Sequence, residues 1–435
     1  MALERMRGKR IQIGELAVVV GAGRSGLAAA RLLRREGARV RLLDSNAAAL
    51  DADRREELRA LGVEVQLGEH SAAQFENAAM VVPSPGIPVA GLADYLPAQA
   101  TGGPEVLAEM ELAWRYLEQE PVLAVTGTSG KTTTVSLAAA MLQTQGYAVF
   151  LDGNIGTPLS EYVLSGRKAD VLVLEVSSFQ LQGCTTFCPR VGVLLNLFPN
   201  HLDYHKDMAE YTEAKFRLFR CQDEGDLAII ASDLQSLAGK FKLSVRKHWL
   251  RSAERFSQSN LLGVHNQYNM EAAWQACRFF GVSEANAARA VAAFRPLPHR
   301  LEKVCRRQGV LYVNDSKCTT VAALKVALEA FTQPVRLLCG GKFKGGDLAA
   351  LRDLVREKVV EVALFGASRE HFESAWQDIV PMHWYSRLEE AVQALAATAR
   401  QGDVILLAPA TASFDLYKSY TERGDDFRRI AGGLA

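Results

Sequence analysis

The sequence lacks an excess of charge of either sign. It has 50 lysine and arginine residues against 49 aspartate and glutamate residues, which gives a formal net charge of +1. Proteins that bind nucleic acid or an anionic membrane through electrostatics usually carry a strong basic surplus. We therefore expect no nucleic-acid partner, and we expect ligands to be recognised by a few local groups.

The chain also lacks paired cysteines and long apolar runs. None of its seven cysteines forms a CxxC pair, and the closest two are Cys184 and Cys188. This spacing favours reduced thiols over disulfides or a zinc site. The first ten residues, MALERMRGKR, are basic, but the apolar run after them ends at Gly21 and suits a strand. Because neither a secretion signal nor a membrane span is evident, we expect a cytoplasmic protein without membrane insertion.

The most informative segment present is TGTSGKTTT, residues 126–134. An apolar strand pattern (PVLAV) precedes it and a helical pattern follows it, so the segment would open a helix N-terminus, where backbone N–H groups point at anions. Lys131 suits the outer phosphates of a nucleotide, and the Thr132 hydroxyl suits Mg²⁺. The usual phosphate-loop pattern would have a further glycine at Val125, and an ordinary Gly/Ser/Thr turn is the alternative interpretation. The segment predicts an ATP site formed by Gly127, Thr128, Ser129, Gly130, Lys131, Thr132 and Thr133.

The length of the chain and its alternating strand and helix patterns indicate three α/β domains. We place them at residues 1–108, 109–299 and 300–435. The first is typical of a Rossmann-like domain, the second of a central parallel-sheet ATPase domain, and the third of a C-terminal Rossmann-like α/β domain.

In the first block, a strand pattern (LAVVV) leads into the turn GAGRSG, then a helix, then a strand that ends at Asp44. Gly21, Gly23 and Gly26 have the spacing of a dinucleotide-binding turn. This pattern is compatible with NAD, FAD or another diphosphate. The later PSPG turn, residues 83–86, either faces the same ligand or is a structural proline turn.

In the second block, Glu175 ends the strand pattern VLVLEV, and His201 follows the next strand pattern. Both could converge beside the phosphates and contact Mg²⁺, although a core histidine is the alternative for His201. Lys215 lies on an amphipathic helical stretch and, taken alone, would be a surface lysine. Asn266 and Asn269 open an apolar helix, where they could contact adenine or cap the helix.

In the third block, polar side chains again follow strand patterns. They are Asp315, Lys317, Lys342, Lys344 and Ser413. Ligands of open α/β sheets bind outside the carboxyl ends of the strands, so we expect these residues to face a ligand-binding cleft.

Taken together in order, the segments resemble the Mur ligases of peptidoglycan assembly. The resemblance rests on TGTSGKTTT, DGNIGTP, EVSSFQL, NHLDYH, YTEAKFRLF, HNQYN, LPHRLE, NDSKCTT and ATASFDLYKSY. It covers nearly the whole chain. The GAGRSG turn, LPHR, NDSK and the SFDLYKSY ending are most similar to the branch that adds D-glutamate to UDP-N-acetylmuramoyl-L-alanine. The resemblance implies an ATP-dependent carbon–nitrogen ligase that acts through an acyl phosphate, as a monomer.

The resemblance also implies roles for individual residues. The glycine turn would hold the diphosphate of the UDP-linked precursor, and the residues implied on that substrate are Ser25, Asp44, Ser84, Gly86 and Asn154. The implied catalytic residues are Lys131, Glu175, His201, Lys215 and Arg300. Two Mg²⁺ ions would be held by Thr132, Glu175, His201 and Lys215, with Lys215 carrying a carbamate. The implied ATP contacts outside the loop are Asn266, Asn269, Arg300, Asp315 and Lys317. The implied glutamate pocket is formed by Thr319, Lys344, Ser413, Phe414 and Tyr420.

Three positions depart from the pattern of that branch. Asn46 stands where arginine is usual, Arg24 where a neutral residue is usual, and Lys342 where an acidic residue is common. We expect Arg24 to supply the charge missing at Asn46. The alternatives are a ligase of the same family that adds L-glutamate or another amino acid, a nicotinamide-dependent oxidoreductase, and a non-catalytic nucleotide-binding protein.

Overall fold

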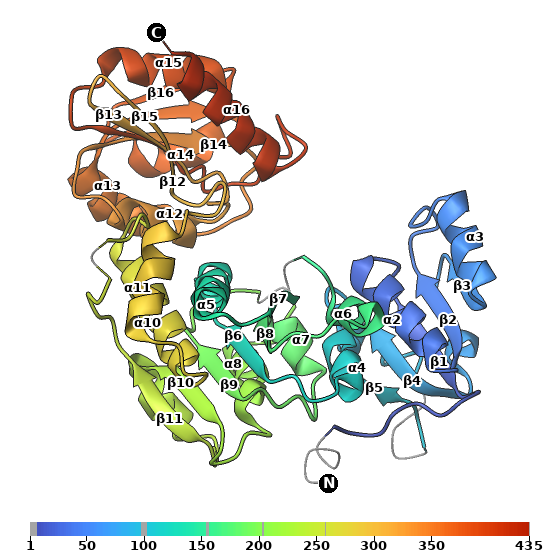
Figure 1. Cartoon of the computed structure of the whole chain (residues 1–435). Helices are drawn as coiled ribbons and strands as arrows, with labels where there is room; N and C mark the ends of the chain where they lie inside the picture. The colour runs from blue at the N-terminus through green and yellow to red at the C-terminus, as the bar shows by residue number, and fades with distance from the viewer. Residues whose placement is uncertain (1–6, 97–101, 154–155, 202–203, 257, 435) are drawn as a thin grey trace. The chain divides into compact units, whose positions relative to one another are not determined.

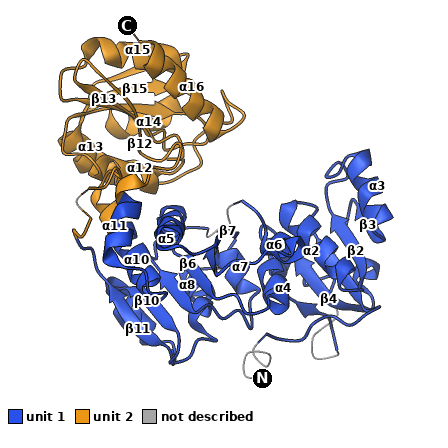
Figure 2. Cartoon of the chain, viewed as in Figure 1, with its two compact units in different colours: residues 1–253, 269–291 blue, residues 254–268, 292–435 orange. Residues whose placement is uncertain are grey.

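The computed structural model describes residues 7–96, 102–153, 156–201, 204–256 and 258–434. The described residues form three β-sheets, each accompanied by helices (Figure 1). The chain divides into two compact units (Figure 2). Unit 1 comprises Met1–Ala253 and Asn269–Val291 and contains the first two sheets, while unit 2 comprises Glu254–Tyr268 and Ala292–Ala435 and contains the third.

The first sheet has the strand order β3-β2-β1-β4-β5, and its strands pair in parallel. The strands are β1 (Leu16–Val20), β2 (Arg39–Asp44), β3 (Val63–Leu67), β4 (Ala78–Pro83) and β5 (Glu105–Val106). The helices are α2 (Arg24–Arg35) and α3 (Ala52–Ala60). This strand order is that of the first five strands of a Rossmann sheet, which confirms the expected fold of the first block.

The second sheet has the order β11-β10-β9-β6-β8-β7, again with parallel pairs. Its strands are β6 (Val122–Thr126), β7 (Val149–Gly153), β8 (Val171–Glu175), β9 (Val191–Leu194), β10 (Leu227–Ala231) and β11 (Arg246–Leu250). The accompanying helices are α4 (Glu109–Tyr116), α5 (Lys131–Gln145), α6 (Leu159–Ser165), α7 (Ser178–Gln182), α8 (Met208–Phe216), α9 (Gln235–Ala238) and α11 (Glu284–Ala293). Helix α10 (Val264–Arg278) runs from one unit into the other.

The third sheet has the order β12-β13-β17-β14-β15-β16. Only β12 pairs antiparallel with its neighbour among the described strands, and the other pairs are parallel. Its strands are β12 (Glu302–Arg307), β13 (Val310–Asn314), β14 (Val335–Gly340), β15 (Val359–Phe365), β16 (Met382–Tyr385) and β17 (Val404–Leu407). Its helices are α12 (Val321–Glu329), α13 (Arg352–Lys358), α14 (Arg369–Trp376), α15 (Leu388–Thr398) and α16 (Tyr420–Gly433).

The central strands are buried along their whole length, as expected for parallel sheets covered on both faces. Every residue of β1, β6, β8 and β14 is buried. Such strands show as continuous apolar runs in the sequence, which is why their positions could be predicted. Polar groups are then confined to the strand ends, and that is where the candidate site lies.

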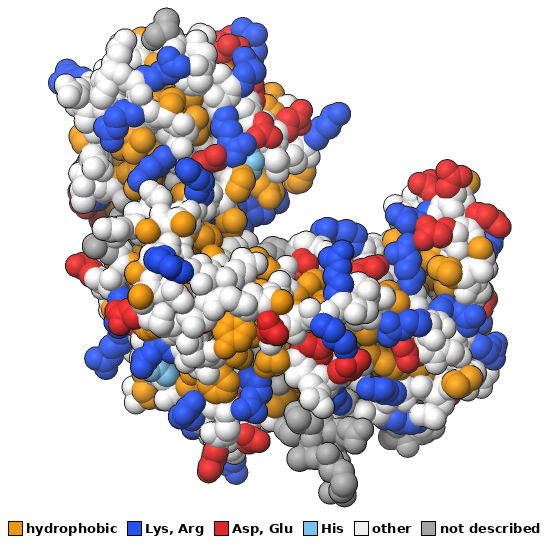
Figure 3. Space-filling model, viewed as in Figure 1, with side chains coloured by type: hydrophobic (Ala, Val, Ile, Leu, Met, Phe, Trp, Pro, Cys, Tyr) orange, Lys and Arg blue, Asp and Glu red, His pale blue; other side chains and the backbone are white. Residues whose placement is uncertain are grey.

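The prediction of reduced cysteines is confirmed. All seven cysteines are free thiols. No described helix is long and apolar enough to cross a membrane. On the face shown in Figure 3, basic and acidic side chains are interspersed, in keeping with a net charge near zero.

Candidate active site

The segment TGTSGKTTT forms a loop between β6 and α5, as the sequence predicts. Gly130 precedes α5 with a left-handed φ of +83°, and a Cβ at this position would meet the side chain of Asn269. Gly127 has a φ of +151°, and a Cβ there would lie 3.1 Å from the Leu195 Cβ. Both glycines are therefore required by the tight path of the loop. The loop ends at the N-terminus of α5, where the first N–H groups of the helix have no partner within the helix and can bind an anion.

The two lysines implied in catalysis meet at one backbone oxygen. The Lys131 ammonium donates to the carbonyl oxygens of Gly127 (2.8 Å) and Thr128 (3.1 Å). The Lys215 ammonium donates to the same Gly127 oxygen at 3.1 Å and to the Thr126 hydroxyl at 3.3 Å. Lys215 is only 2% exposed, so its interpretation as a surface lysine is wrong. Burial, together with the nearby Lys131 charge, lowers the pKa of Lys215 well below its usual value, against the opposing effect of Glu175.

Thr132 and Glu175 are in direct contact. The Thr132 hydroxyl donates to Glu175 Oε2 at 2.7 Å, and Glu175 is buried at the end of β8. His201 is exposed, with a left-handed φ of +56°, so the core-histidine alternative is wrong. Its ring packs edge-on against Phe179, with 4.8 Å between ring centroids. Phe179 belongs to α7, which begins just after Glu175, so His201 and Glu175 are brought to the same edge of the second sheet.

Two residues that support the phosphate loop were missed from the sequence. Asn196, just after β9, accepts hydrogen bonds through its side-chain oxygen from the N–H groups of Thr128 (2.9 Å) and Ser129 (3.0 Å). Its amide nitrogen donates to the Ser129 carbonyl. Tyr211 on α8 contacts the Thr128 hydroxyl at 3.0 Å. Asn196 follows a strand that pairs with β6, and this placement was the available signal.

Asp44, at the end of β2, makes a hydrogen bond to the glycine turn after β1. The Asp44 carboxylate accepts from the N–H groups of Ala22 (2.7 Å) and Asn46 (2.9 Å). A Cβ on Gly26 would collide with the Gly21 carbonyl oxygen. Only glycine at position 26 therefore lets the first turn of α2 pack this closely against the glycine turn. Asp44 thus orients the turn through its backbone.

The other described residues implied on the precursor lie around this turn or close to it. The Ser84 hydroxyl donates to the Gly21 carbonyl at 3.3 Å. Ser25 is partly exposed and Gly86 is exposed. The Arg24 guanidinium, also exposed, donates to the Gly156 carbonyl at 2.9 Å, in the loop after β7. Asn154 lies outside the described residues.

In unit 2, three of the residues implied as ATP contacts make separate local contacts. The Asp315 carboxylate accepts from the Leu301 N–H at 3.2 Å, and burial raises the pKa of Asp315 to about 7, against the opposing effect of Arg300. The Lys317 ammonium lies over the Tyr420 ring, 4.1 Å from its centroid. The Asn266 amide, at the start of α10, donates to the Leu262 carbonyl.

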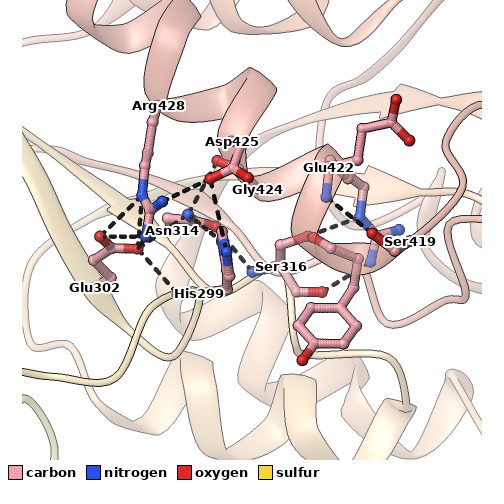
Figure 4. A network of polar contacts seen from close by, with 11 residues as sticks. His299, Glu302, Asn314, Ser316, Ser419, Glu422, Gly424, Asp425 and Arg428 are labelled. Carbon is pink, nitrogen blue, oxygen red and sulfur yellow. Dashed lines mark hydrogen bonds and ion pairs between the residues drawn. The ribbon is translucent and has the colours of Figure 1, made fainter.

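His299, next to Arg300, lies beside Asn314 at the end of β13 and Gly424 on α16 (Figure 4). Its ring nitrogen Nδ1 lies 3.0 Å from the Asn314 amide nitrogen, which also donates to the Gly424 carbonyl at 3.1 Å. The His299 carbonyl accepts from the Lys317 N–H at 3.1 Å. The His299 backbone therefore links the segment at Arg300 to the segment at Lys317. The sequence did not reveal this link.

The residues implied in the glutamate pocket follow β13, β14 and β17. Ser413 is 2% exposed, whereas Phe414 is 65% exposed and carries the Lys344 ammonium 5.7 Å from its ring centroid. Thr319 is partly exposed. Lys342 exchanges two backbone hydrogen bonds with Ala412, which joins the loops that follow β14 and β17.

Comparison with known proteins decides which kind of site this is. Three family models match the chain in order: the Mur ligase MurD-like N-terminal domain at residues 15–105, the Mur ligase middle domain at 125–257, and the Mur ligase glutamate ligase domain at 299–411. The chain belongs to the Mur ligase family. It is therefore an ATP-dependent amide ligase by family, and the nicotinamide-dependent alternative for the glycine turn has no support.

Relatives of the chain match it from end to end. A UDP-N-acetylmuramoylalanine-D-glutamate ligase of Desulfovibrio desulfuricans is 71% identical over 439 residues, covering 100% of each chain. A ligase of the same name from Nitratidesulfovibrio vulgaris is 62% identical over 435 residues, again covering 100% of each chain.

Solved structures share the fold at low sequence identity. The MurF ligase of Thermotoga maritima, in complex with ADP, is 18% identical with a TM-score of 0.60, and 99% of each chain is covered. MurF of Acinetobacter baumannii is 16% identical with a TM-score of 0.61, covering 95% of this chain and 93% of its own. These matches agree with the three-domain α/β architecture seen here.

Proposed function

We propose that the protein joins D-glutamate to UDP-N-acetylmuramoyl-L-alanine, with ATP as the energy source, in peptidoglycan precursor synthesis. The observation that carries this proposal is the 71% identity, over the full length of both chains, to a relative named for that reaction. The described sites agree with it in kind. The chain has a phosphate loop, a diphosphate-type glycine turn, and a basic, hydroxyl-rich strand edge in unit 2.

The reaction needs ATP because a carboxylate is a poor acyl donor. We assign the loop Gly127–Thr133 to the ATP phosphates. The terminal L-alanine carboxylate of the precursor would attack the γ-phosphoryl group, and an acyl phosphate and ADP would form. Lys131 now donates to two carbonyls of its own loop. With nucleotide bound, its ammonium would turn to the phosphates and stabilise the charge on the transferring group.

The residues around Thr132 fit Mg²⁺. Thr132 and Glu175 supply hydroxyl and carboxylate oxygens in contact with each other, and Mg²⁺ prefers oxygen ligands with phosphates completing its shell. Among the described residues no group of three or more His, Cys, Asp or Glu side chains could hold a metal by itself. This fits a metal bound jointly by protein and ATP. The ion would neutralise charge on the phosphate oxygens.

We propose that Lys215 carries a carbamate. The side chain is buried beside Lys131, within reach of the loop oxygens of Thr126 and Gly127. An anionic group here would pair with the Lys131 cation and would add an oxygen ligand to the set formed by Thr132, Glu175 and His201. In this way, the modification would remove the repulsion between two neighbouring cations and extend the metal site.

In the second step, the glutamate amine would attack the acyl phosphate and release phosphate. We assign the glutamate carboxylates to Lys344 and to the hydroxyl groups of Thr319, Ser413 and Tyr420, with Phe414 beside them. We assign further ATP contacts to Asn266, Asn269, Arg300, Asp315 and Lys317. These assignments rest on the family resemblance and on the placement of the residues at strand ends.

Phosphate release tests the proposal. The protein would be supplied with ATP, Mg²⁺ and UDP-N-acetylmuramoyl-L-alanine, with D-glutamate, L-glutamate or no amino acid. We expect turnover with D-glutamate alone. Turnover with L-glutamate instead would mean that the amino-acid pocket has been assigned wrongly, and no turnover in any mixture would reject the proposed reaction.

We also propose a cytoplasmic location, since seven free thiols and a need for ATP suit that compartment.

A further inference from the structure

Arg423, on α16, is a buried cation, and it makes no ion pair with any residue that the structure describes. Its side chain is 0% exposed. The guanidinium donates to four neutral oxygens: the Ser316 hydroxyl (3.0 Å), the Ser316 carbonyl (2.9 Å), the Thr411 carbonyl (3.2 Å) and the Gly340 carbonyl (3.4 Å). Burial lowers its pKa to about 10, so the group remains charged at neutral pH.

Two other buried arginines of this protein, Arg336 and Arg115, do form ion pairs with carboxylates. Arg336, in the same sheet, pairs with Asp403 at 2.8 Å and Glu361 at 2.5 Å. Arg115, in unit 1, pairs with Glu105 at 2.6 Å and Glu111 at 3.5 Å. Asp415 is the carboxylate that acts most strongly on the pKa of Arg423. Its oxygen, however, accepts a hydrogen bond from the Ala367 N–H. A buried charge without a counter-charge is costly, so an anion is expected to complete this site.

The four bonds of Arg423 join the carboxyl ends of three neighbouring strands. Ser316 follows β13, Thr411 follows β17, and Gly340 ends β14, and in the sheet β17 lies between β13 and β14. The Ser316 hydroxyl also donates to the Tyr420 carbonyl at 2.7 Å, at the start of α16. Arg423 therefore sets the relative positions of three loops and of the first turn of α16.

Those loops carry the residues assigned to the amino-acid pocket. Lys344 follows Gly340, Ser413 follows Thr411, and Tyr420 is held through Ser316. We propose that Arg423 is a positioning residue for the anionic amino acid: it locks the three loops in place, and its unpaired charge favours a dicarboxylate over a neutral side chain. This inference rests on the proposed function, which supplies glutamate as the ligand.

Kinetic constants for each substrate test the proposal on the full-length enzyme. Arg423→Gln removes the charge and part of the fork, whereas Arg423→Lys keeps the charge with fewer donors. For Arg423→Gln we expect the KM for D-glutamate to rise about tenfold or more, with the KM for the UDP precursor within about twofold of wild type. The preference for D-glutamate over D-glutamine, as a ratio of kcat/KM, should fall about tenfold, and Arg423→Lys should retain most of it.

Arg336→Lys is the matched control, because it perturbs a buried, charge-paired arginine of the same sheet. It should lower the unfolding temperature without changing the KM for D-glutamate. Equal changes in every KM, or an unchanged preference for glutamate in Arg423→Gln, would reduce Arg423 to a structural role and overturn the proposal. Should Arg423→Gln fail to fold, Arg423→Lys decides, since loss of its glutamate preference would likewise contradict a role for the charge. Wild-type turnover is measured first, so that failure of the proposed reaction is seen separately.

Discussion

The ammonium groups of Lys131 and Lys215 share one acceptor, the carbonyl oxygen of Gly127, at 2.8 and 3.1 Å. When both ammonium groups are charged, their mutual repulsion makes this arrangement unfavourable. It becomes favourable once one of them is neutral or converted to an anion and the other turns to a phosphate. The predictions below follow from this relationship and from the residues around it.

Lys215→Arg is expected to lower kcat by about 100-fold or more, because arginine cannot form the carbamate that would extend the metal site. Stripping bicarbonate from the wild-type enzyme should reduce activity, and adding it back should restore activity. Lys206→Arg serves as the control, since Lys206 is exposed and shortly precedes α8. Full activity in Lys215→Arg would reject a carbamate at this residue.

Thr132→Ala is expected to raise the Mg²⁺ concentration for half-maximal activity about tenfold, because a hydroxyl next to Glu175 is lost. Thr144→Ala, on the same helix, removes a hydroxyl whose hydrogen bond among the described residues is to the Ala140 carbonyl of that helix. Its Mg²⁺ titration should match that of wild type. Superimposable titrations for both variants would remove Thr132 from the metal site.

Arg24→Ala is expected to raise the KM for the UDP precursor about tenfold, the effect of one lost charged contact. The KM for ATP should not change. Arg35→Ala, on the same helix, removes a comparable bond to the Val163 carbonyl and is the control. Unaltered affinity of Arg24→Ala for the precursor, measured by calorimetry, would show that Arg24 only joins α2 to the loop after β7.

Asp315→Asn is expected to change how stability depends on pH. Burial raises the folded-state pKa of Asp315 from 3.8 to about 7, so the folded protein holds this proton more tightly than the unfolded chain does. The stability that the proton contributes is complete below pH 4 and is lost as the pH rises toward 7. Asparagine can accept the Leu301 N–H bond without that loss. The variant should gain at least about 1 kcal/mol over wild type between pH 5 and pH 8 in urea unfolding. An equal difference at both pH values would contradict the raised pKa.

The local parts of the site could be predicted from the sequence. The phosphate loop depends on two glycines and one lysine within the short segment TGTSGKTTT, and on the strand and helix on either side of it. The parallel strands were visible as apolar runs, and Glu175, Asp315 and Ser413 were expected near strand ends because ligands of such sheets bind there.

The remainder depended on contacts between distant segments. The burial of Lys215 comes from Thr126, Gly127 and Tyr211, none of which its helical pattern reveals. Arg423 stands in the polar run TERGDDFRR, which by itself is typical of a solvated helix face. Asn196 supports the phosphate loop only because β9 pairs with β6. In each case a charged or polar side chain is placed by the sheet order, which periodicity does not encode.

The most direct test of the account is phosphate release from ATP and Mg²⁺ with UDP-N-acetylmuramoyl-L-alanine and one amino acid at a time. The account predicts release with D-glutamate and none with L-glutamate or without an amino acid. Release that is independent of D-glutamate, or no release at all, would contradict it.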